Sequence, residues 1–347
     1  MPGEAPILDR LGRPLSDLRI SVIDECNFRC TYCMPKDLFG EGHPFLPYNM
    51  LLTFDEIVRV ATLAAGLGVR KIKLTGGEPL MRMGVHELVP RLLAIDGIED
   101  LGLITNGFHL GPLAPLLRRA GLERITISLD SIVPDTFDRI TGRSGNLPRV
   151  LEGIAAARDA GFHNIKVNMV VQRGVNDHEV EQMAGHFRHT GITLRFIEYM
   201  DVGSRTTFQN ELLVPNAELR TRLHSEYGLE PVAESYGGEV ADRYRYTDGA
   251  GEIGFISSMT QPFCRSCTRL RLSADGKLYR CLFSGVGLDT RAVLRGQSDD
   301  PDAELEDAMR RFWYGREDRY SELRGGETEV ESVTPRSGRV EMYRMGG

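Results

Sequence analysis

The feature that most constrains the fold is an alternation of short β-branched runs with longer stretches of helical periodicity, between about residues 18 and 200. The runs predicted as strands are residues 18–24, 71–77, 101–107, 124–130, 164–171 and 194–200. Strands that alternate with helices favour a parallel sheet, and right-handed crossovers curl such a sheet towards a barrel. Six units are too few for a closed eight-fold barrel. The sequence therefore predicts an α/β fold with an open or partial β/α barrel of about six units.

Two of the intervening stretches, residues 53–68 and 147–161, have the amphipathic pattern of helices. The first carries Thr53 at the expected N-cap and Glu56 three residues later, which is the pattern of a capping box. Both stretches end in glycine, the residue favoured just after a helix. We therefore predict a helix over each stretch.

Composition limits the class of protein. The chain has 347 residues with 41% hydrophobic residues, enough for one large or two medium domains. The alternation becomes irregular after about residue 205, so we predict a partial barrel over 1–205 and a C-terminal region over 206–347. The net charge of -7 argues against binding a nucleic-acid polymer, which needs a basic surface, but allows a small anionic ligand. No signal-peptide pattern or membrane-length apolar run occurs, so we expect a soluble, cytoplasmic protein.

The six cysteines form two groups of three. The first trio is Cys26, Cys30 and Cys33 (C-x3-C-x2-C), and the second trio is Cys264, Cys267 and Cys281 (C-x2-C-x13-C). In a reducing compartment such groups bind metal more often than they form disulfides. A structural zinc site needs four ligands, whereas three cysteines on a four-iron cluster leave one iron open to another ligand. We favour an iron–sulfur cluster at each trio, with zinc completed by a distant ligand as the alternative.

The segment TGGEP ends the second predicted strand. Ligands of parallel α/β sheets gather at the carboxyl ends of the strands. Gly76 and Gly77 would let the backbone approach a ligand, and Glu78 can accept a hydrogen bond from an ammonium group. A plain strand-to-loop turn is the alternative interpretation.

Residues 269–283 predict a β-hairpin with an Asp-Gly pair at its turn. Arg269 and Arg271 are two residues apart and so share a face of the strand. Their guanidinium groups suit a phosphate-bearing ligand, although a solvated hairpin face is the alternative. A two-residue turn pairs Cys281 with Leu270, and a slip by one residue pairs it with Arg271 instead. The sequence leaves this register open.

Basic residues also occur on four of the predicted strands. They are Arg19 on the first, Lys73 on the second, Lys166 on the fifth and Arg195 on the sixth. Buried positive charges are costly without a partner, so a polyanion would stabilise them if they converge on one face of the barrel. Ordinary surface charges are the alternative for each residue taken alone.

The C-x3-C-x2-C loop after the first strand of a partial barrel resembles the radical S-adenosylmethionine (SAM) superfamily. The resemblance implies that the first trio holds a [4Fe-4S] cluster with SAM on its open iron. An electron from this cluster then cleaves SAM to a 5′-deoxyadenosyl radical. The resemblance also implies SAM contacts for Tyr32, Gly77, Glu78, Ser128 and Met200.

The two trios, the segments CTRLRLSADGKLYRCL and RFIEYMDVG and the terminal diglycine together resemble the GTP 3′,8-cyclase family of molybdenum cofactor biosynthesis. This resemblance covers the chain from about Leu18 to its end. It implies a lyase with two [4Fe-4S] clusters, in which the radical removes H3′ of GTP and C3′ attacks C8 to give 3′,8-cyclo-7,8-dihydro-GTP. The second cluster would hold the guanine edge. Contacts with GTP are implied for Arg19, Lys73, Thr105, Lys166, Arg269 and Arg271.

The resemblance also gives the C-terminal tail a role in the active site. Gly346 and Gly347 carry no side chains and can enter a narrow channel, and we predict that Arg195 pairs with the terminal carboxylate. Further implied partners are an external electron donor, a downstream cyclic pyranopterin monophosphate synthase and a second copy of the chain in a homodimer.

The chain departs from the family pattern at two places. After GGEPL it reads MRMGVHEL instead of two arginines and an acid, and Arg344 lies among the apolar positions of the tail. These differences concern local packing and leave the trios intact. Two alternatives remain, another two-cluster radical SAM enzyme and a non-catalytic metal-binding protein.

Overall fold

A computed structural model of the chain describes residues 6–40, 42–200, 202–203, 209–234, 238–324 and 338–346. The first six strands are β1 Asp17–Ser21, β2 Lys71–Thr75, β3 Asp100–Thr105, β4 Arg124–Ser128, β5 Asn164–Val171 and β6 Thr193–Glu198. They confirm the six predicted strands, although most end earlier than predicted. The strands of the C-terminal region are β7 Leu229–Val232, β8 Asp242–Tyr246, β9 Glu252–Ile256, β10 Arg269–Leu272, β11 Lys277–Tyr279 and β12 Leu288–Asp289.

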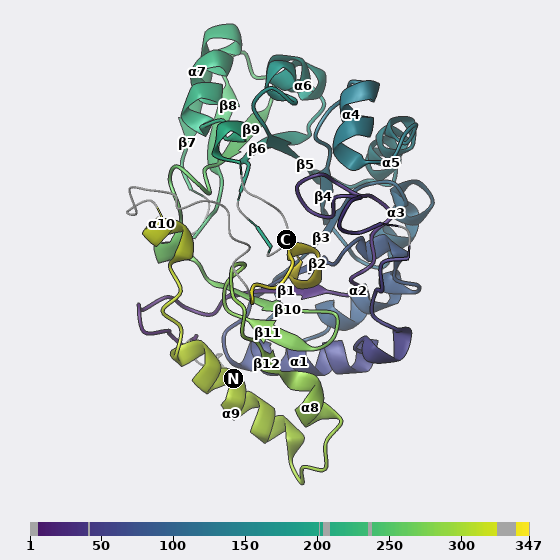
Figure 1. Cartoon of the computed structure of the whole chain (residues 1–347), viewed down its shortest axis with the longest axis vertical. Coiled ribbons are helices and arrows are strands. Elements are labelled where there is room, and N and C mark those ends of the chain that lie inside the picture. Colours follow the sequence, from purple (N-terminus) through teal and green to yellow (C-terminus); the bar gives the residue numbers. More distant parts are fainter. Residues whose placement is uncertain are drawn as a thin grey trace.

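All these strands join one curved sheet in the order β12-β11-β10-β1-β2-β3-β4-β5-β6-β9-β8-β7 (Figure 1). The strands from β10 to β9 in this order run parallel, and antiparallel pairs close each edge. The C-terminal region thus extends the six-strand barrel at both sides, because β10 pairs with β1 and β9 pairs with β6. The sheet is an open, partial β/α barrel, as predicted.

Helices follow most of the barrel strands and line the outer side of the sheet (Figure 1). They are α1 Phe54–Gly66, α2 Val85–Leu93, α3 Leu110–Arg119, α4 Pro134–Thr141, α5 Leu147–Asp159 and α6 Val180–Phe187. The C-terminal region adds α7 Asn216–Tyr227, α8 Thr290–Leu294, α9 Pro301–Tyr314, α10 Tyr320–Arg324 and α11 Met342–Met345. Short 3-10 helices are Tyr48–Met50, Pro79–Met81, Asp177–Glu179, Asn210–Leu212 and Cys264–Ser266. The predicted helices correspond to α1 and α5.

The capping box at the start of α1 is confirmed. The Glu56 N–H donates to the Thr53 hydroxyl at 3.2 Å, and the Thr53 N–H donates to the Glu56 carboxylate at 2.7 Å. Each residue therefore satisfies a backbone donor that the first turn of the helix leaves unpaired.

The barrel strands separate an apolar outer face from a polar inner face. On β1, Leu18 and Ile20 are buried in the same hydrophobic core as Val60 of α1. Arg19 lies between them in the strand and projects to the opposite side, as does Lys73 on β2, because successive side chains of a strand alternate. The fold thus turns the basic residues of the strands towards the inside of the barrel.

The hairpin β10–β11 has neither of the two registers considered from the sequence. Arg271 pairs with Tyr279, so the turn holds three residues, 274–276, instead of two. Gly276 ends this turn with a φ of +85°, a conformation that glycine adopts without strain. Cys281 lies two residues after Tyr279, the last paired residue of β11.

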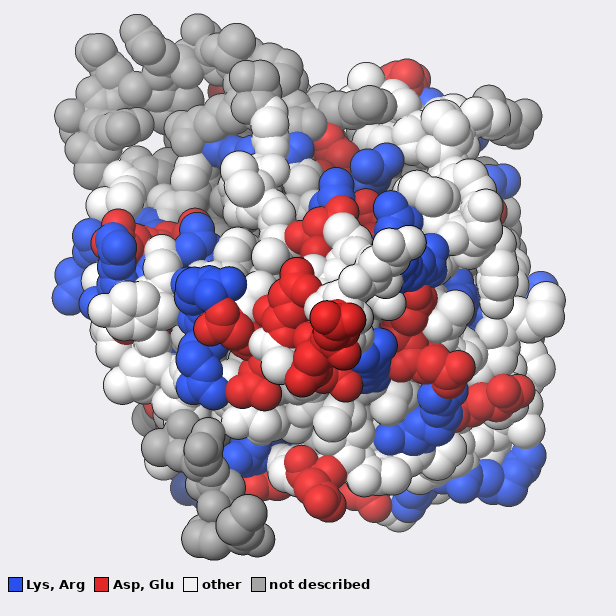
Figure 2. Space-filling view, turned by 90° about the horizontal axis from the view of Figure 1, so that it is seen from below, with Lys and Arg blue, Asp and Glu red and all other residues white. Residues whose placement is uncertain are grey.

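The outer surface differs from the inner one in its charges. On the face shown in Figure 2, acidic side chains gather near the middle, with basic side chains between and around them. None of the helices in the described part of the chain is both long and apolar enough to cross a membrane.

The capping box predicts a measurable effect on stability. Replacing Thr53 with alanine removes the acceptor for the Glu56 N–H, and we expect the free energy of unfolding to fall by about 1 kcal/mol. Guanidinium unfolding followed by circular dichroism measures this change. Thr62→Ala on the same helix is the matched control, because the Thr62 hydroxyl donates to a helix carbonyl and alanine favours helix. An unchanged midpoint for Thr53→Ala would show that the box does not stabilise α1.

Candidate active site

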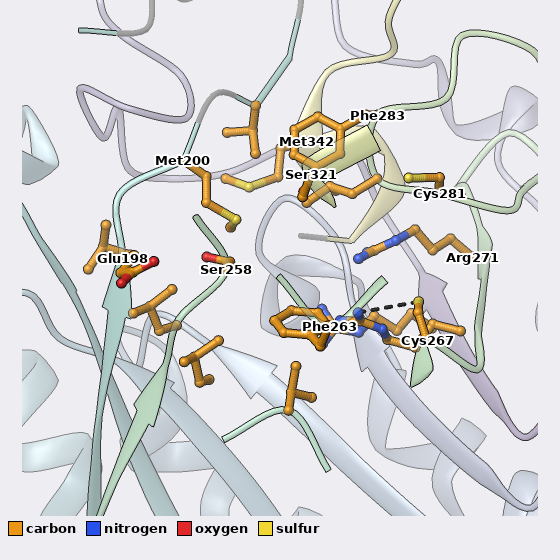
Figure 3. A pocket seen from close by; sticks show the side chains of 18 of the residues that line it. Glu198, Met200, Ser258, Phe263, Cys267, Arg271, Cys281, Phe283, Ser321 and Met342 are labelled. Atoms are coloured by element: carbon orange, nitrogen blue, oxygen red, sulfur yellow. Dashed lines mark hydrogen bonds between the residues drawn. The ribbon is translucent and has the colours of Figure 1, made fainter. Parts of the chain in front are cut away.

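A cavity of about 240 Å³ lies inside the barrel and brings together most of the predicted site residues. Its wall includes Arg19, Tyr32, Lys73, Ser128, Arg195, Met200, Arg269, Arg271, Cys264, Cys267 and Cys281. Figure 3 shows Cys267, Cys281 and Arg271 on one side of this cavity, with Met200 and Glu198 opposite them. The strand ends of the barrel and the second trio therefore face one space.

Gly76 and Gly77 allow two segments of the chain to approach each other closely, and the expected approach of a ligand stays a prediction. A Cβ atom on Gly77 would lie 2.2 Å from the Glu25 carbonyl oxygen, and one on Gly76 would lie 2.5 Å from that of Ile23. The backbone of Gly77 donates to Ile23 O at 2.7 Å. These contacts hold the start of the loop that carries the first trio against the end of β2.

The thiols of the first trio lie in a poorly solvated loop. Burial, with the nearby Glu78 charge, raises the pKa of Cys26 to about 12, and burial also raises the pKa values of Cys30 and Cys33. The Cys26 sulfur accepts from the Phe28 N–H at 3.4 Å. Three thiolates at this place need cationic partners, which iron atoms would provide.

The cysteine geometry separates the metal alternatives. All six cysteines are free of disulfides. Among the residues that the structure describes, no three His, Cys, Asp or Glu side chains converge on a position for a single metal ion. Each trio supplies three thiolates, one fewer than the ligands of a structural zinc site, whereas each cysteine of an iron–sulfur cluster binds a different iron atom. The donor set of both trios therefore suits a cluster with one open iron.

Glu78 is buried and held by the end of β3. Its carboxylate accepts from the Thr105 hydroxyl at 2.6 Å, the Asn106 N–H at 2.7 Å and the Leu80 N–H at 3.0 Å. Burial raises the pKa of Glu78 to about 7, against the effect of these hydrogen bonds. Thr105, which was predicted to contact GTP, thus supports Glu78 and is not among the residues that line the cavity.

Tyr32 reaches the cavity wall through a partner that the sequence analysis missed. Its hydroxyl donates to Asp130 at 2.7 Å, and the same carboxylate accepts from the Val170 N–H at 2.8 Å. Burial raises the pKa of Asp130 to about 6. The position of Asp130 at the end of the fourth predicted strand was the available signal.

Three basic side chains stand in one row across the sheet. Arg271 on β10 pairs with Arg19 on β1, which pairs with Lys73 on β2. Neighbouring strands lie only about 4.8 Å apart, and like charges placed opposite each other repel. Burial and repulsion by Arg269 lower the pKa of Arg19 to about 10, and burial with repulsion by Arg19 lowers the pKa values of Lys73 and Arg271. This cation row is suited to an anion in the cavity.

Two further cations lie on the other side of the barrel. The Arg195 Nε donates to the Asn168 side-chain oxygen at 2.9 Å. Burial and repulsion by Arg195 lower the pKa of Lys166 to about 8. Lys166 faces a small adjoining cavity that it shares with Lys73 and Arg195, so it extends the basic region of the main cavity.

Cys267 of the second trio lies between two arginines. Its sulfur accepts from Arg269 Nη2 at 3.3 Å and from Arg316 Nη2 at 3.1 Å. Burial alone would raise the pKa of this thiol, but the charges of Arg269 and Arg316 lower it to about 6. Arg316 was missed because it lies 49 residues after Cys267, outside any recognisable pattern.

The C-terminal tail enters the barrel near β1 and β2 (Figure 1), and it contacts the cation row at Arg271. Arg271 Nη1 donates to the Gly346 carbonyl at 2.6 Å. Gly346 has a φ of +67°, and a Cβ atom there would lie 2.1 Å from the Thr75 side chain. Arg271 therefore contacts the tail directly. Gly347 lies outside the described residues, so its pairing with Arg195 stays a prediction.

Comparison with known proteins identifies the family. Residues 20–187 match the Radical SAM superfamily, and residues 192–322 match Molybdenum Cofactor Synthesis C. A protein of Acidothermus cellulolyticus named GTP 3′,8-cyclase is 49% identical over 99% of both chains. Proteins with the same name from Xanthomonas axonopodis pv. citri (47%; 99% of both) and Staphylococcus epidermidis (45%; 98% of this chain, 99% of the relative) are similar. The chain belongs to the GTP 3′,8-cyclase family.

Solved structures share the fold of this family member. Streptococcus suis SuiB has a TM-score of 0.58 at 13% identity, over 91% of this chain and 69% of SuiB. SuiB bound to S-adenosylmethionine has a TM-score of 0.59 at 14% identity, over 96% and 72% of the two chains. At such low identity the likeness concerns the fold alone, and it agrees with the partial barrel of the radical SAM type.

The close approach at Gly77 predicts that a single methyl group disturbs the first trio. In Gly77→Ala the new Cβ would meet the Glu25 backbone at 2.2 Å, so the cysteine loop must move. We expect the iron content after anaerobic reconstitution to fall by about half, because each trio is expected to hold one cluster and the first trio would lose its cluster. Gly111→Ala is the control, because a Cβ there meets nothing within 4 Å. Parental iron content in Gly77→Ala would contradict the prediction.

Proposed function

We propose that this chain converts GTP to 3′,8-cyclo-7,8-dihydro-GTP by radical SAM chemistry, in the biosynthesis of the molybdenum cofactor. The observation that carries the proposal is the meeting of the cation row and the second trio on the wall of one cavity. Relatives that are 44–49% identical over nearly their whole length carry the name of this reaction.

Each trio would hold one [4Fe-4S] cluster. The first trio comprises Cys26, Cys30 and Cys33, and the second comprises Cys264, Cys267 and Cys281. When bound, the first cluster supplies the electron that cleaves SAM, and the second supplies an open iron position for the guanine edge. The second trio lines the cavity, and Tyr32 of the loop that carries the first trio reaches the same wall, so SAM and GTP would meet there.

SAM would bind beside the first trio. Tyr32, Ser128 and Met200 line the cavity and can contact it, and Gly77, which holds the cysteine loop, is a further proposed contact of SAM. Glu78 is the proposed acceptor for the SAM ammonium group. A carboxylate accepts about four hydrogen bonds, and the three described donors leave room for one more.

The triphosphate of GTP would neutralise the cation row. Arg19, Lys73 and Arg271 repel one another when the cavity holds no anion, so phosphate oxygens would bind them favourably. Arg269 and Lys166 extend the same basic region. Thr105 stays a weaker candidate, since its hydroxyl is donated to Glu78.

The diglycine tail would act next to the bound triphosphate. The Gly346 carbonyl accepts from Arg271, so the tail orients a guanidinium group of the cation row. Absence of a side chain is required there because a Cβ would collide with Thr75. We assign Gly346, Gly347 and Arg195 to this catalytic arrangement, with Arg195 as the partner of the terminal carboxylate.

Several partners belong to the same proposal. An external electron donor would reduce the first cluster, and cyclic pyranopterin monophosphate synthase would consume the product. The chain would act in the cytoplasm as a homodimer. These partners stay predictions from the family resemblance.

The lowered lysine pKa values predict that GTP binding weakens in alkaline solution. Lys166, with a pKa of about 8, loses its charge between pH 7 and 9, and Lys73 titrates below its usual range. Deprotonation removes positive charge, so we expect GTP affinity to be about tenfold lower at pH 9 than at pH 7. Calorimetry on the reconstituted protein at constant ionic strength measures this. Lys166→Met should bind more weakly at pH 7 with a flatter pH profile; equal affinity at both pH values in the parent would refute the role of these lysines.

The function itself is tested by anaerobic turnover. Protein reconstituted with iron and sulfide is mixed with dithionite, SAM and each of the four ribonucleoside triphosphates in turn, and 5′-deoxyadenosine and cyclised nucleotide are quantified. We expect cyclised product with GTP alone. SAM cleavage that yields no cyclised GTP would indicate another radical SAM reaction, and absence of cleavage in fully reconstituted protein would favour a non-catalytic role.

Two cysteine variants separate the roles of the trios in the same assay. Cys30→Ala should abolish SAM cleavage because the first trio is incomplete. Cys281→Ala should retain some SAM cleavage but lose the cyclised product. Cleavage that persists in Cys30→Ala would overturn the assignment of the first trio.

A further inference from the structure

The C-x2-C segment of the second trio is held by two arginines that share one aspartate. Arg13 Nη1 donates to the Cys264 carbonyl at 2.8 Å, and Arg316 Nη1 donates to the Cys267 carbonyl at 2.6 Å. The Asp9 carboxylate lies between them and accepts from Arg13 Nε at 2.5 Å and from Arg316 Nη1 at 3.4 Å. Each cysteine of the pair thus has its carbonyl bound by one arm of the same ionic network.

This network is almost completely removed from water. Asp9, Arg13 and Arg316 are 5%, 2% and 1% exposed. The indole N–H of the buried Trp313 donates to the Arg13 carbonyl at 3.2 Å, and its ring lies 4.6 Å from the Arg316 guanidinium carbon. A buried charge is tolerated only where its partners are fixed, so these contacts give Arg316 one defined orientation.

Arg316 also makes the one contact of this network with a thiol. Its Nη2 donates to the Cys267 sulfur at 3.1 Å while its Nη1 binds the carbonyl of the same residue. One carboxylate between two guanidinium groups leaves a net positive charge beside the cysteines. Positive charge and N–H···S hydrogen bonds at cluster cysteines stabilise the reduced, more negative state of an iron–sulfur cluster.

We propose that Arg316 is a positioning residue that holds Cys267 for the second cluster and raises the reduction potential of that cluster, with Asp9 and Arg13 fixing its orientation. The proposal rests on the proposed function only in that the second trio carries an iron–sulfur cluster. Arg269 also donates to the Cys267 sulfur, but it lies beside the cation row. Arg316 lines the same cavity but is paired with Asp9, so its contact with Cys267 is held in place without an anion in the cavity.

The test isolates the second cluster in full-length Cys30→Ala protein, which lacks one ligand of the first. In this background we compare Arg316→Gln and Arg316→Met, which remove the charge, with Arg316→Lys, which keeps it. Arg311→Gln is the control, because Arg311 is an exposed residue of α9 paired with Asp307. Iron content, iron loss to a chelator and the midpoint potential from a titration followed by electron paramagnetic resonance are measured.

We expect Arg316→Gln and Arg316→Met to lose iron faster and to show a more negative potential than the parent. Arg316→Lys should stay near the parental potential, and Arg311→Gln should match the parent in every measurement. Complete loss of the cluster from the Gln and Met variants, with retention in the Lys variant, would support the same role. A parental potential at full iron content in Arg316→Gln would overturn the inference, as would equal damage in Arg311→Gln.

Failure of the proposed function and failure of the inference about Arg316 give different results. If the Cys30→Ala parent itself binds no iron, the second cluster of the proposed function is wrong, and the role of Arg316 is wrong with it. If this parent binds a cluster that no Arg316 variant affects, only the inference about Arg316 is wrong. If the Lys variant is shifted as far as the Gln variant, its charge does not set the potential, which also contradicts the inference.

Discussion

The parallel pairing of β10 with β1 is the interaction on which the active site depends. It joins a strand from the C-terminal region to the first strand of the barrel, about 250 residues earlier in the chain. The pairing sets Arg271 opposite Arg19, and it places Cys267 beside the start of β1, whereas the loop with the first trio follows the end of that strand. Without this contact the two cysteine groups would belong to separate parts of the molecule.

The pairing of β10 with β1 brings positive charges together inside the protein. Three cations stand side by side inside a molecule whose net charge is -7. Their repulsion works against folding, because buried like charges are costly. The large hydrophobic core between the other face of the sheet and the helices offsets this cost. The Gly346 carbonyl offers partial compensation to Arg271. The wall of the cavity thus carries concentrated positive charge, which an anion would neutralise.

Several residues make supporting contacts that the sequence did not reveal. Gly77 holds the cysteine loop against β2, and Thr105 holds Glu78. Nothing in the sequence pointed to Arg316, because its partners Asp9 and Cys267 are distant in the chain. The hairpin was predicted correctly and its register was left open; the three-residue turn gives neither of the two registers considered, although it uses the same Asp-Gly pair. The contacts of Gly77, Thr105 and Arg316 join residues that are far apart in the chain, and no sequence pattern links such residues.

By itself, the sequence determined the six β–α units, the capping box of α1, the two cysteine trios and the basic residues of the strands. These features are local, because side-chain period, turn chemistry and ligand spacing act over a few residues. Tertiary structure alone decided that the C-terminal strands extend both edges of the barrel, that Arg271 meets the tail, and that a buried Asp9–Arg316 pair supports Cys267. Those contacts arise from sheet register and burial of charge, which depend on the packing of the whole chain.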